Sequence, residues 1–128
     1  MLGGTRNFSS FSASDLAAEK QFYGQTLGLD VTEDHGMLRL HLAGGHEALI
    51  YPKPDHQPAS FTVLNFEVAD LDREVDELMG KGVTFERYEQ FDQDDRGIAS
   101  DGDGAMPRIA WFTDPAGNVL SVMEELPA

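Results

Sequence analysis

The feature that most constrains the fold of this chain is an internal repeat. When residue 11 is placed on residue 66, Phe11 meets Phe66 and Asp15 meets Asp70, and the similarity continues for about 20 residues. Each copy reads as an alternating segment, an aspartate, a helical stretch, a glycine and further alternating segments. This pattern predicts two equivalent modules in tandem.

The elements of each module follow from local signals. Asp15 and Asp70 are predicted helix N-caps, because a short carboxylate accepts hydrogen bonds from the free N–H groups of the first helical turn. Strands are predicted at 37–42 and 48–52 in the first copy, and at 108–112 and 119–123 in the second. We therefore predict an α+β fold with two βαβββ modules, about 6–52 and 61–125, that form curled mixed sheets around a central cleft. A proline-rich linker, 52–60, would join them into a single domain, 1–128.

Composition excludes several classes of function. The 128 residues contain no cysteine, which removes disulfides, thiolate nucleophiles and cysteine-ligated metals. The formal net charge of −14 argues against nucleic acid or an anionic membrane as a partner. No apolar run is long enough to cross a membrane and no signal-peptide pattern occurs, so we expect a cytoplasmic protein.

Three segments carry a resemblance to a known family: "SDLAAEKQFYGQTLGLDV", "FEVADLDREVDELMGKGV" and "WFTDPAGNVLSVMEE". With these, the chain resembles the vicinal oxygen chelate superfamily, which includes glyoxalase I, bleomycin-resistance proteins, fosfomycin-resistance enzymes and extradiol dioxygenases. The similarity extends from about residue 6 to residue 125. It implies the paired-module fold, but one fold hosts many functions.

The resemblance also implies where metal ligands would lie. In the metal-dependent members, His, Gln or Glu side chains occupy positions that fall here on Phe8, Val63 and Ser121, with the fourth on Leu49 or Tyr51. Phenylalanine, valine and leucine offer no donor atom to a cation, and serine and tyrosine are weak ligands without carboxylate or imidazole partners. We therefore predict no metal site and no cofactor.

Two residues are candidates for catalysis if the protein is an enzyme. Glu67 shares a strand face with Asn65, and His41 shares one with Arg39, on the faces predicted to line the cleft. A carboxylate or an imidazole in such a place can act as a general base. The simpler interpretations are a carboxylate paired with an arginine and a hydrogen-bonding histidine.

Aromatic side chains supply the remaining signal. The predicted substrate-binding residues lie on or beside the cleft strands, and they are Tyr51, Asn65, Tyr88, Phe91, Arg108 and Trp111. They indicate a cleft suited to a flat or apolar small molecule. Together with the vacant metal positions, the resemblance then favours a small-molecule binding protein of the glyoxalase/bleomycin-resistance type. The alternative is a related lyase, isomerase or oxidoreductase that acts on a small organic substrate. Exposed strand edges further predict a homodimer, which light scattering would detect.

Overall fold

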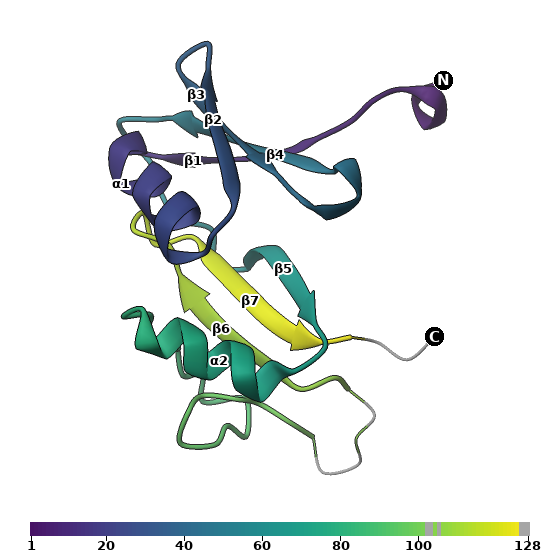
Figure 1. Ribbon diagram of the computed structural model, residues 1–128, viewed down its shortest axis with the longest axis vertical. Coiled ribbons are helices and arrows are strands. Elements are labelled where there is room, and N and C mark those ends of the chain that lie inside the picture. Colours follow the sequence, from purple (N-terminus) through teal and green to yellow (C-terminus); the bar gives the residue numbers. More distant parts are fainter. Residues whose placement is uncertain (102–103, 105, 126–128) are drawn as a thin grey trace. The chain divides into compact units, whose positions relative to one another are not determined.

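The computed structural model describes residues 1–101, 104 and 106–125, and it divides the chain into two compact units. The first unit comprises residues 1–58 and the second residues 59–128, so the division falls inside the predicted linker. Each unit holds one sheet and one α-helix, as Figure 1 shows. The α+β fold of two related sheet modules is thereby confirmed.

The first unit contains a four-stranded mixed sheet in the order β1-β4-β3-β2. Strand β1 pairs parallel with β4, and the other pairs are antiparallel. The elements are β1 (Ser9–Ala13), α1 (Leu16–Gln21), a π-helical turn (Phe22–Thr26), β2 (Asp30–Asp34), β3 (Met37–His41) and β4 (Glu47–Pro52), with short 3₁₀ turns at Leu2–Gly4 and Ala43–Gly45.

The predicted cap and core face of this unit are both present. The Asp15 carboxylate accepts a hydrogen bond from the Ala18 N–H at 3.1 Å, which begins α1 at Leu16. Leu38 and Leu40 are buried, whereas Arg39 and His41, on the alternate face of β3, are only partly covered. Leucine therefore marks the core side of this sheet, as the alternation predicts.

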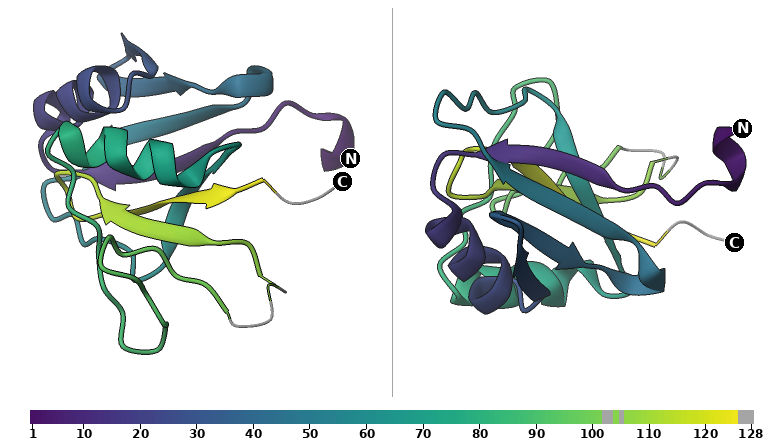
Figure 2. Two further views of the ribbon diagram at one scale, coloured as in Figure 1. Left: turned by 60° about the horizontal axis from the view of Figure 1, so that its bottom comes forward. Right: turned by 90° about the horizontal axis from the view of Figure 1, so that it is seen from above.

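The second unit contains a three-stranded sheet in the order β5-β7-β6, with β5 parallel to β7. Its elements are β5 (Thr62–Val68), α2 (Leu71–Gly80), β6 (Ile109–Thr113) and β7 (Val119–Glu124). The Asp70 carboxylate caps α2 by accepting from the Arg73 N–H at 3.1 Å. Helix α2 lies along one side of the sheet, as Figure 2 shows, and packs on β7.

The two faces of the second sheet differ in what covers them. The face toward α2 forms the core of the unit, with Leu71, Val75, Ala110, Phe112 and Leu120 all at most 2% exposed. The other face carries Asn65, Ser121 and Trp111 in one cross-strand row, because these residues are in register. Tyr88, Phe91, Ala99 and Ser100 approach this second face, so it is the one on which a site can form.

One predicted strand is nearly absent from the second unit. The βαβββ pattern predicts a strand that begins in the segment after α2, to match β2 of the first unit. In the structure, this segment contributes only an isolated bridge between Phe85 and Phe112, together with a hydrogen bond from the Glu86 N–H to the Trp111 carbonyl at 2.7 Å. The chain turns away at Tyr88, whose N–H bonds to the Gln93 side chain instead of a neighbouring strand.

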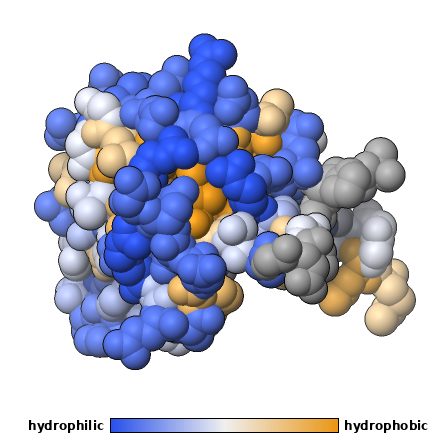
Figure 3. All heavy atoms as spheres, turned by 90° about the horizontal axis from the view of Figure 1, so that it is seen from below, coloured by the Kyte–Doolittle hydropathy of each residue, from blue (hydrophilic) through white to orange (hydrophobic). Residues whose placement is uncertain are grey.

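The surface agrees with the acidic composition. Figure 3 shows a largely hydrophilic face in which hydrophobic residues gather only in small areas. Within the described residues, no helix has both the length and the apolar character needed to cross a membrane.

Candidate functional site

The candidate site is built around Trp111, the only tryptophan of the chain, on the open face of the second sheet. Ser121, its neighbour on β7, is fully buried and donates a hydrogen bond to the Asn65 side-chain oxygen at 2.5 Å. This bond fixes the orientation of the Asn65 amide group, because its oxygen is the acceptor. The two N–H donors of the same group can then bind another acceptor. The row therefore combines a flat apolar surface with a polar edge.

Two further aromatic rings pack on Trp111. The Tyr88 ring meets it edge-on, with ring centroids 5.3 Å apart, and the Phe91 ring lies tilted at 4.8 Å. Phe91 is nonetheless 46% exposed, so one of its faces remains open to solvent. Burial, with a smaller contribution from the Glu86 carboxylate, raises the pKa of the Tyr88 phenol. The three predicted aromatic residues Tyr88, Phe91 and Trp111 thus form one cluster.

Two cavities adjoin this cluster, and Phe91 and Trp111 line both. One, of about 290 Å³, is completed by Ser60, Phe61, Thr62, Tyr88, Gln90 and Val119. The other, of about 270 Å³, is completed by Ala99, Ser100, Asp101, Met106, Pro107, Ile109 and Met123. The Phe91 ring lies at the boundary between them, and a change in its rotamer would alter both.

The loop that carries Phe91 is held by specific contacts. The Gln93 side chain accepts from the Tyr88 N–H and donates to the carbonyls of Glu86 and Gly97, at 2.7, 2.9 and 2.8 Å. Ala99 bridges to Ile109 on β6 through two backbone hydrogen bonds. This part of the loop is therefore held as a wall of the site by hydrogen bonds.

A charged network joins the same loop to helix α2. Arg96 forms ion pairs with Asp72 and Asp76. Asp72 also forms an ion pair with Arg108, with an N···O distance of 3.1 Å. Arg108 is further paired with Glu124 at 3.1 Å. The structure therefore places Arg108, a predicted substrate-binding residue, in a network that includes the helix and not beside Trp111. Hydrogen bonds from Arg108 and then Arg96 lower the pKa of Asp72 to about 2.

This network makes the second unit sensitive to acid. The unfolded Asp72 carboxyl has a pKa near 3.8, above its folded value, so the unfolded state binds the proton more readily. The contribution of Asp72 to stability is therefore complete above about pH 4 and is lost as the pH falls toward 2. We expect Asp72→Asn to reduce the loss of stability across this range in urea titrations. Asp95→Asn, at an exposed position of the same loop, should leave the acid dependence as in the native protein.

The candidates from the first unit lie in a polar environment. His41 contacts the Thr32 hydroxyl through Nε2 at 2.9 Å and Glu47 through Nδ1 at 3.4 Å, so both ring nitrogens are engaged. Arg39 bridges Glu47 and Asp34 on the same face. Tyr51 is 38% exposed near the end of β4. None of these residues belongs to the aromatic cluster of the second unit.

Glu67 lies on the open face of the second sheet. It is in register with Met123 on β7, which in turn pairs with Ile109 on β6, and both partners line the cavity of about 270 Å³. Its side chain is exposed and forms no hydrogen bond or ion pair with any described residue. Glu67 and Asn65, two residues apart on one strand, project from the same face about 7 Å apart.

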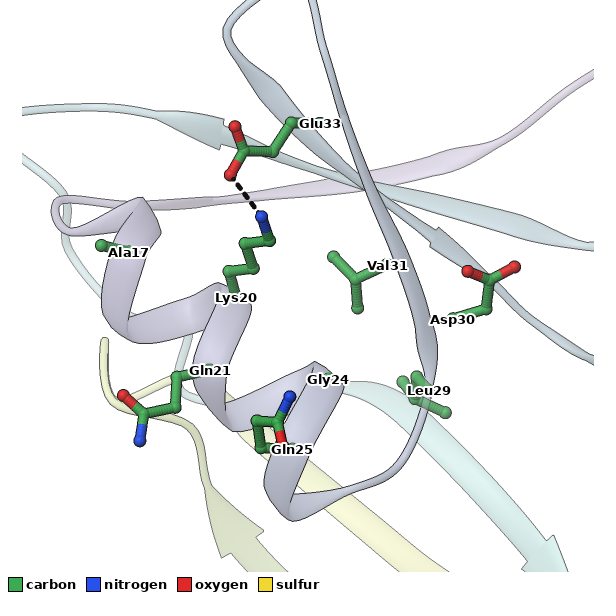
Figure 4. A pocket seen from close by; sticks show the side chains of 9 residues that line it. All are labelled: Ala17, Lys20, Gln21, Gly24, Gln25, Leu29, Asp30, Val31 and Glu33. Atoms are coloured by element: carbon green, nitrogen blue, oxygen red, sulfur yellow. Dashed lines mark ion pairs between the residues drawn. The ribbon is translucent and has the colours of Figure 1, made fainter.

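The first unit contains a larger cavity, of about 520 Å³, between α1, the π-helical turn and β2. Figure 4 shows Lys20 reaching from the helix toward Glu33 on β2, with which it forms an ion pair at 3.0 Å. Five of its nine lining residues carry polar or charged side chains, and none of the nine is a predicted site residue. The aromatic cluster of the second unit is the better candidate for an organic ligand, because apolar lining with few polar groups is typical of such sites.

The positions that would hold a family metal do not fit one. Phe8 precedes β1 and is 53% exposed, and Val63 lies at an irregularity in the pairing of β5 with β7. The Ser121 hydroxyl donates a hydrogen bond to the Asn65 side chain. Among the described residues, no group of three or more His, Asp or Glu side chains is arranged to hold an ion. The donor set of these positions is therefore unsuited to a divalent cation.

A comparison with known families covers both units. The model of the Glyoxalase/Bleomycin resistance protein/Dioxygenase superfamily matches residues 9–122. The chain belongs to this superfamily. The resemblance to vicinal oxygen chelate proteins that the sequence motifs indicated is thereby confirmed. No curated protein matches the chain significantly.

Superfamily structures with 12–23% identity share the fold. A glyoxalase family protein from Enterococcus faecalis is 22% identical, with a TM-score of 0.69 over 97% of this chain and 100% of that one. TnmS3, an antibiotic binding protein from Streptomyces sp. CB03234, is 23% identical, with a TM-score of 0.71 over 96% and 98%. FosX, a fosfomycin resistance protein from Listeria monocytogenes, is 12% identical, with a TM-score of 0.72 over 96% and 94%.

Sequence reasoning missed several residues that build the site. Gln93 organises the loop, and Asp101 contributes a carboxylate to the cavity wall, yet both lie in a segment without periodicity. In the sequence, Asp72 is an acidic residue in the first turn of a predicted helix, which is common. In the structure it forms ion pairs with Arg96 and Arg108. The available signal was indirect: two arginines, Arg96 and Arg108, in an otherwise acidic region imply nearby carboxylate partners.

Proposed function

We propose that this protein binds a small, partly aromatic or apolar organic molecule on the open face of the second sheet, and that it does so without a catalytic divalent metal. The observation that carries the proposal is the position of Trp111. Its ring lines two cavities of about 290 and 270 Å³, and among the described residues the rings of Tyr88 and Phe91 pack against it. A ligand in either cavity would contact this ring.

The chemistry of the site supports binding by apolar burial. Each 100 Å² of apolar surface removed from water contributes about 2.5 kcal/mol, so a flat ring against Trp111 would gain most of its affinity there. The polar groups at the edge, Asn65 and Glu67, are exposed and free to orient the ligand. Few polar groups beside a mainly apolar surface give selectivity, as in small-molecule sites generally.

The residue identities at the family's metal positions support binding over metal-assisted catalysis. The side chains of Phe8 and Val63 have no atom that can coordinate a metal ion. The Ser121 hydroxyl already donates a hydrogen bond to Asn65. TnmS3, which shares the fold, is described as an antibiotic binding protein, so the scaffold is compatible with ligand binding.

Trp111 provides the test, because its fluorescence reports on the site alone. A library of aromatic and apolar metabolites would be screened against protein treated with a chelator. We expect at least one compound to change the emission saturably, and Phe91→Ala to weaken this response about tenfold, which corresponds to about 1.4 kcal/mol of lost ring contact.

Met79→Ala is the matched control. Met79 is also 46% exposed, but it lies on α2, and it should leave the response unchanged. A library without a single saturable response, or a response that Phe91→Ala leaves intact, would contradict the proposed function.

A further inference from the structure

A β-bulge in β5 directs the Thr62 side chain to the open face of the second sheet. Thr62 is paired with Val119 on β7, and Leu64 with the next residue of that strand, so Val63 is an extra residue between the two pairs. In a regular strand, Thr62 and Leu64 would project from the same face. Because of the bulge, Thr62 instead shares a row with Val119, which projects from the same face as Trp111. Bulges often re-aim a side chain in this way beside a functional site.

The Thr62 hydroxyl is available to a ligand. Thr62 lines the cavity of about 290 Å³ and is partly exposed. Its side chain forms no hydrogen bond with any described residue. A hydroxyl carries one donor and two acceptor lone pairs, so this group can donate a hydrogen bond to a ligand carbonyl or accept one from a ligand hydroxyl.

Aromatic side chains line the same cavity. They are those of Phe61, Tyr88, Phe91 and Trp111. Phe61 is 68% exposed and Phe91 is 46% exposed, so both leave apolar surface in water beside the cavity. Apolar surface that gathers around a cavity is typical of a ligand-binding groove, whereas a single exposed apolar side chain is not. An aromatic ring bound here would remove part of this surface from water.

The lining also indicates the charge of the ligand. Tyr88 is the only one of the eight lining residues with a titratable side chain, and burial raises the pKa of its phenol. The other polar groups are the hydroxyls of Ser60 and Thr62 and the amide of Gln90. An ionised ligand group in this cavity would lose water without meeting an opposite charge, which is unfavourable. The cavity therefore favours an uncharged ligand.

We propose that Thr62 determines the specificity of this site, and that the ligand is an uncharged aromatic molecule whose hydroxyl or carbonyl group forms a hydrogen bond with the Thr62 hydroxyl. The ring of the ligand packs against Trp111 and Phe91. This inference rests on the proposed function, because it assigns the Trp111 ligand to one of the two cavities and to one chemical class.

Four probes on one naphthalene ring separate the hydrogen bond from charge and shape: 2-naphthol, naphthalene, 2-naphthoate and 2-naphthylmethylamine. Binding would be followed in protein with ¹³C-labelled methyl groups. Of the two cavities, Val119 lines only that of about 290 Å³, whereas Ile109 and Met123 line only the other. We expect 2-naphthol to shift the Val119 resonances saturably and to bind about 2- to 10-fold more tightly than naphthalene, as one neutral hydrogen bond predicts. The two charged probes should bind at least about tenfold more weakly than 2-naphthol.

Thr62→Val removes the hydroxyl and nearly preserves the shape of the side chain, so it should bring 2-naphthol to the affinity of naphthalene. Thr62→Ser should retain the preference, because it keeps a hydroxyl. Thr113→Val is the matched control: Thr113 pairs with Val119 from the opposite side, on β6, but does not line the cavity, so this variant should bind as the native protein does. The ratio of the two affinities in the native protein tests the proposal even if Thr62→Val folds poorly.

The outcomes distinguish this inference from the proposed function. Equal binding of 2-naphthol and naphthalene to the native protein, or a preference that survives in Thr62→Val, would overturn the role of Thr62 and leave binding at Trp111 intact. Shifts confined to Ile109 and Met123, or charged probes that bind as tightly as 2-naphthol, would overturn the assignment in the same way. If none of the four probes shifts a resonance, the inference fails, and the proposed function fails with it only if the metabolite library also gives no response.

Discussion

Replacing Trp111 by leucine is expected to weaken ligand binding by about 10- to 100-fold while the second unit stays folded. The indole ring offers the largest apolar surface of the site, and the loss of about 50–100 Å² of ligand contact corresponds to about 1.3–2.5 kcal/mol. Leucine preserves an apolar side chain at a position that is only 8% exposed, so the fold tolerates the change better than it would tolerate alanine. Because the substitution removes the fluorophore, calorimetry is the appropriate measurement.

Phe112→Leu is the matched control for this variant. Phe112 follows Trp111 on β6 but points to the opposite face, where it is fully buried and packs edge-on against Phe85, with ring centroids 5.7 Å apart. Its replacement should lower stability without changing affinity. A pair of variants in which Phe112→Leu weakens binding as much as Trp111→Leu does would show that affinity follows stability, and the assignment of the site to the Trp111 face would be wrong.

Gly97→Ala is expected to destabilise the second unit by about 2–5 kcal/mol. Gly97 has a φ of +92°, where an alanine is strained by about 1–2 kcal/mol, and a Cβ there would lie only 3.0 Å from the Phe85 Cβ. Overpacking of that kind adds about 1–3 kcal/mol. The Gly97 carbonyl also accepts from Gln93, so displacement would disturb the loop that carries Phe91 and Asp101. Urea unfolding and ligand titration of the same variant would measure both effects.

Gly82→Ala separates the two causes. Gly82 has a φ of +93°, but a Cβ at this position would meet nothing within 4 Å. The variant should therefore show only the backbone strain, about 1–2 kcal/mol, and should bind ligand normally. Equal destabilisation by the two substitutions would mean that the contact between Gly97 and Phe85 does not constrain the loop.

The parts of the fold that were predictable from sequence depend on local or periodic signals. The carboxylates of Asp15 and Asp70 cap the helices as predicted, because capping involves residues only three positions apart. The alternation around Leu38 and Leu40 gave the buried face of β3 correctly, since side chains alternate across a strand. The strand that the βαβββ pattern predicts after α2 is reduced to an isolated bridge between Phe85 and Phe112, because the Tyr88 N–H donates to the Gln93 side chain and not to a neighbouring strand.

The candidate site was predictable only in its apolar part. Tyr88, Phe91 and Trp111 were named from their position near cleft strands, and the structure brings them together. Arg108 was expected at the site because it begins the strand predicted at 108–112, but its side chain pairs with Asp72, which lies 36 residues earlier in sequence. The same reason hid Asp101, which lines the cavity of about 270 Å³ from an irregular segment. Long-range pairing of this kind leaves no periodic trace in a single sequence.

The measurement that tests the central claim most directly is a titration of the Trp111 indole N–H resonance with the best compound from the fluorescence screen, in chelator-treated protein and again after addition of Zn, Ni, Fe or Mn. We expect a saturable shift with the same dissociation constant in every sample, because the site is formed by Trp111, Phe91 and their neighbours without a metal. A shift that occurs only after one of these metals is restored, or binding that leaves the Trp111 resonance unchanged, would contradict the account.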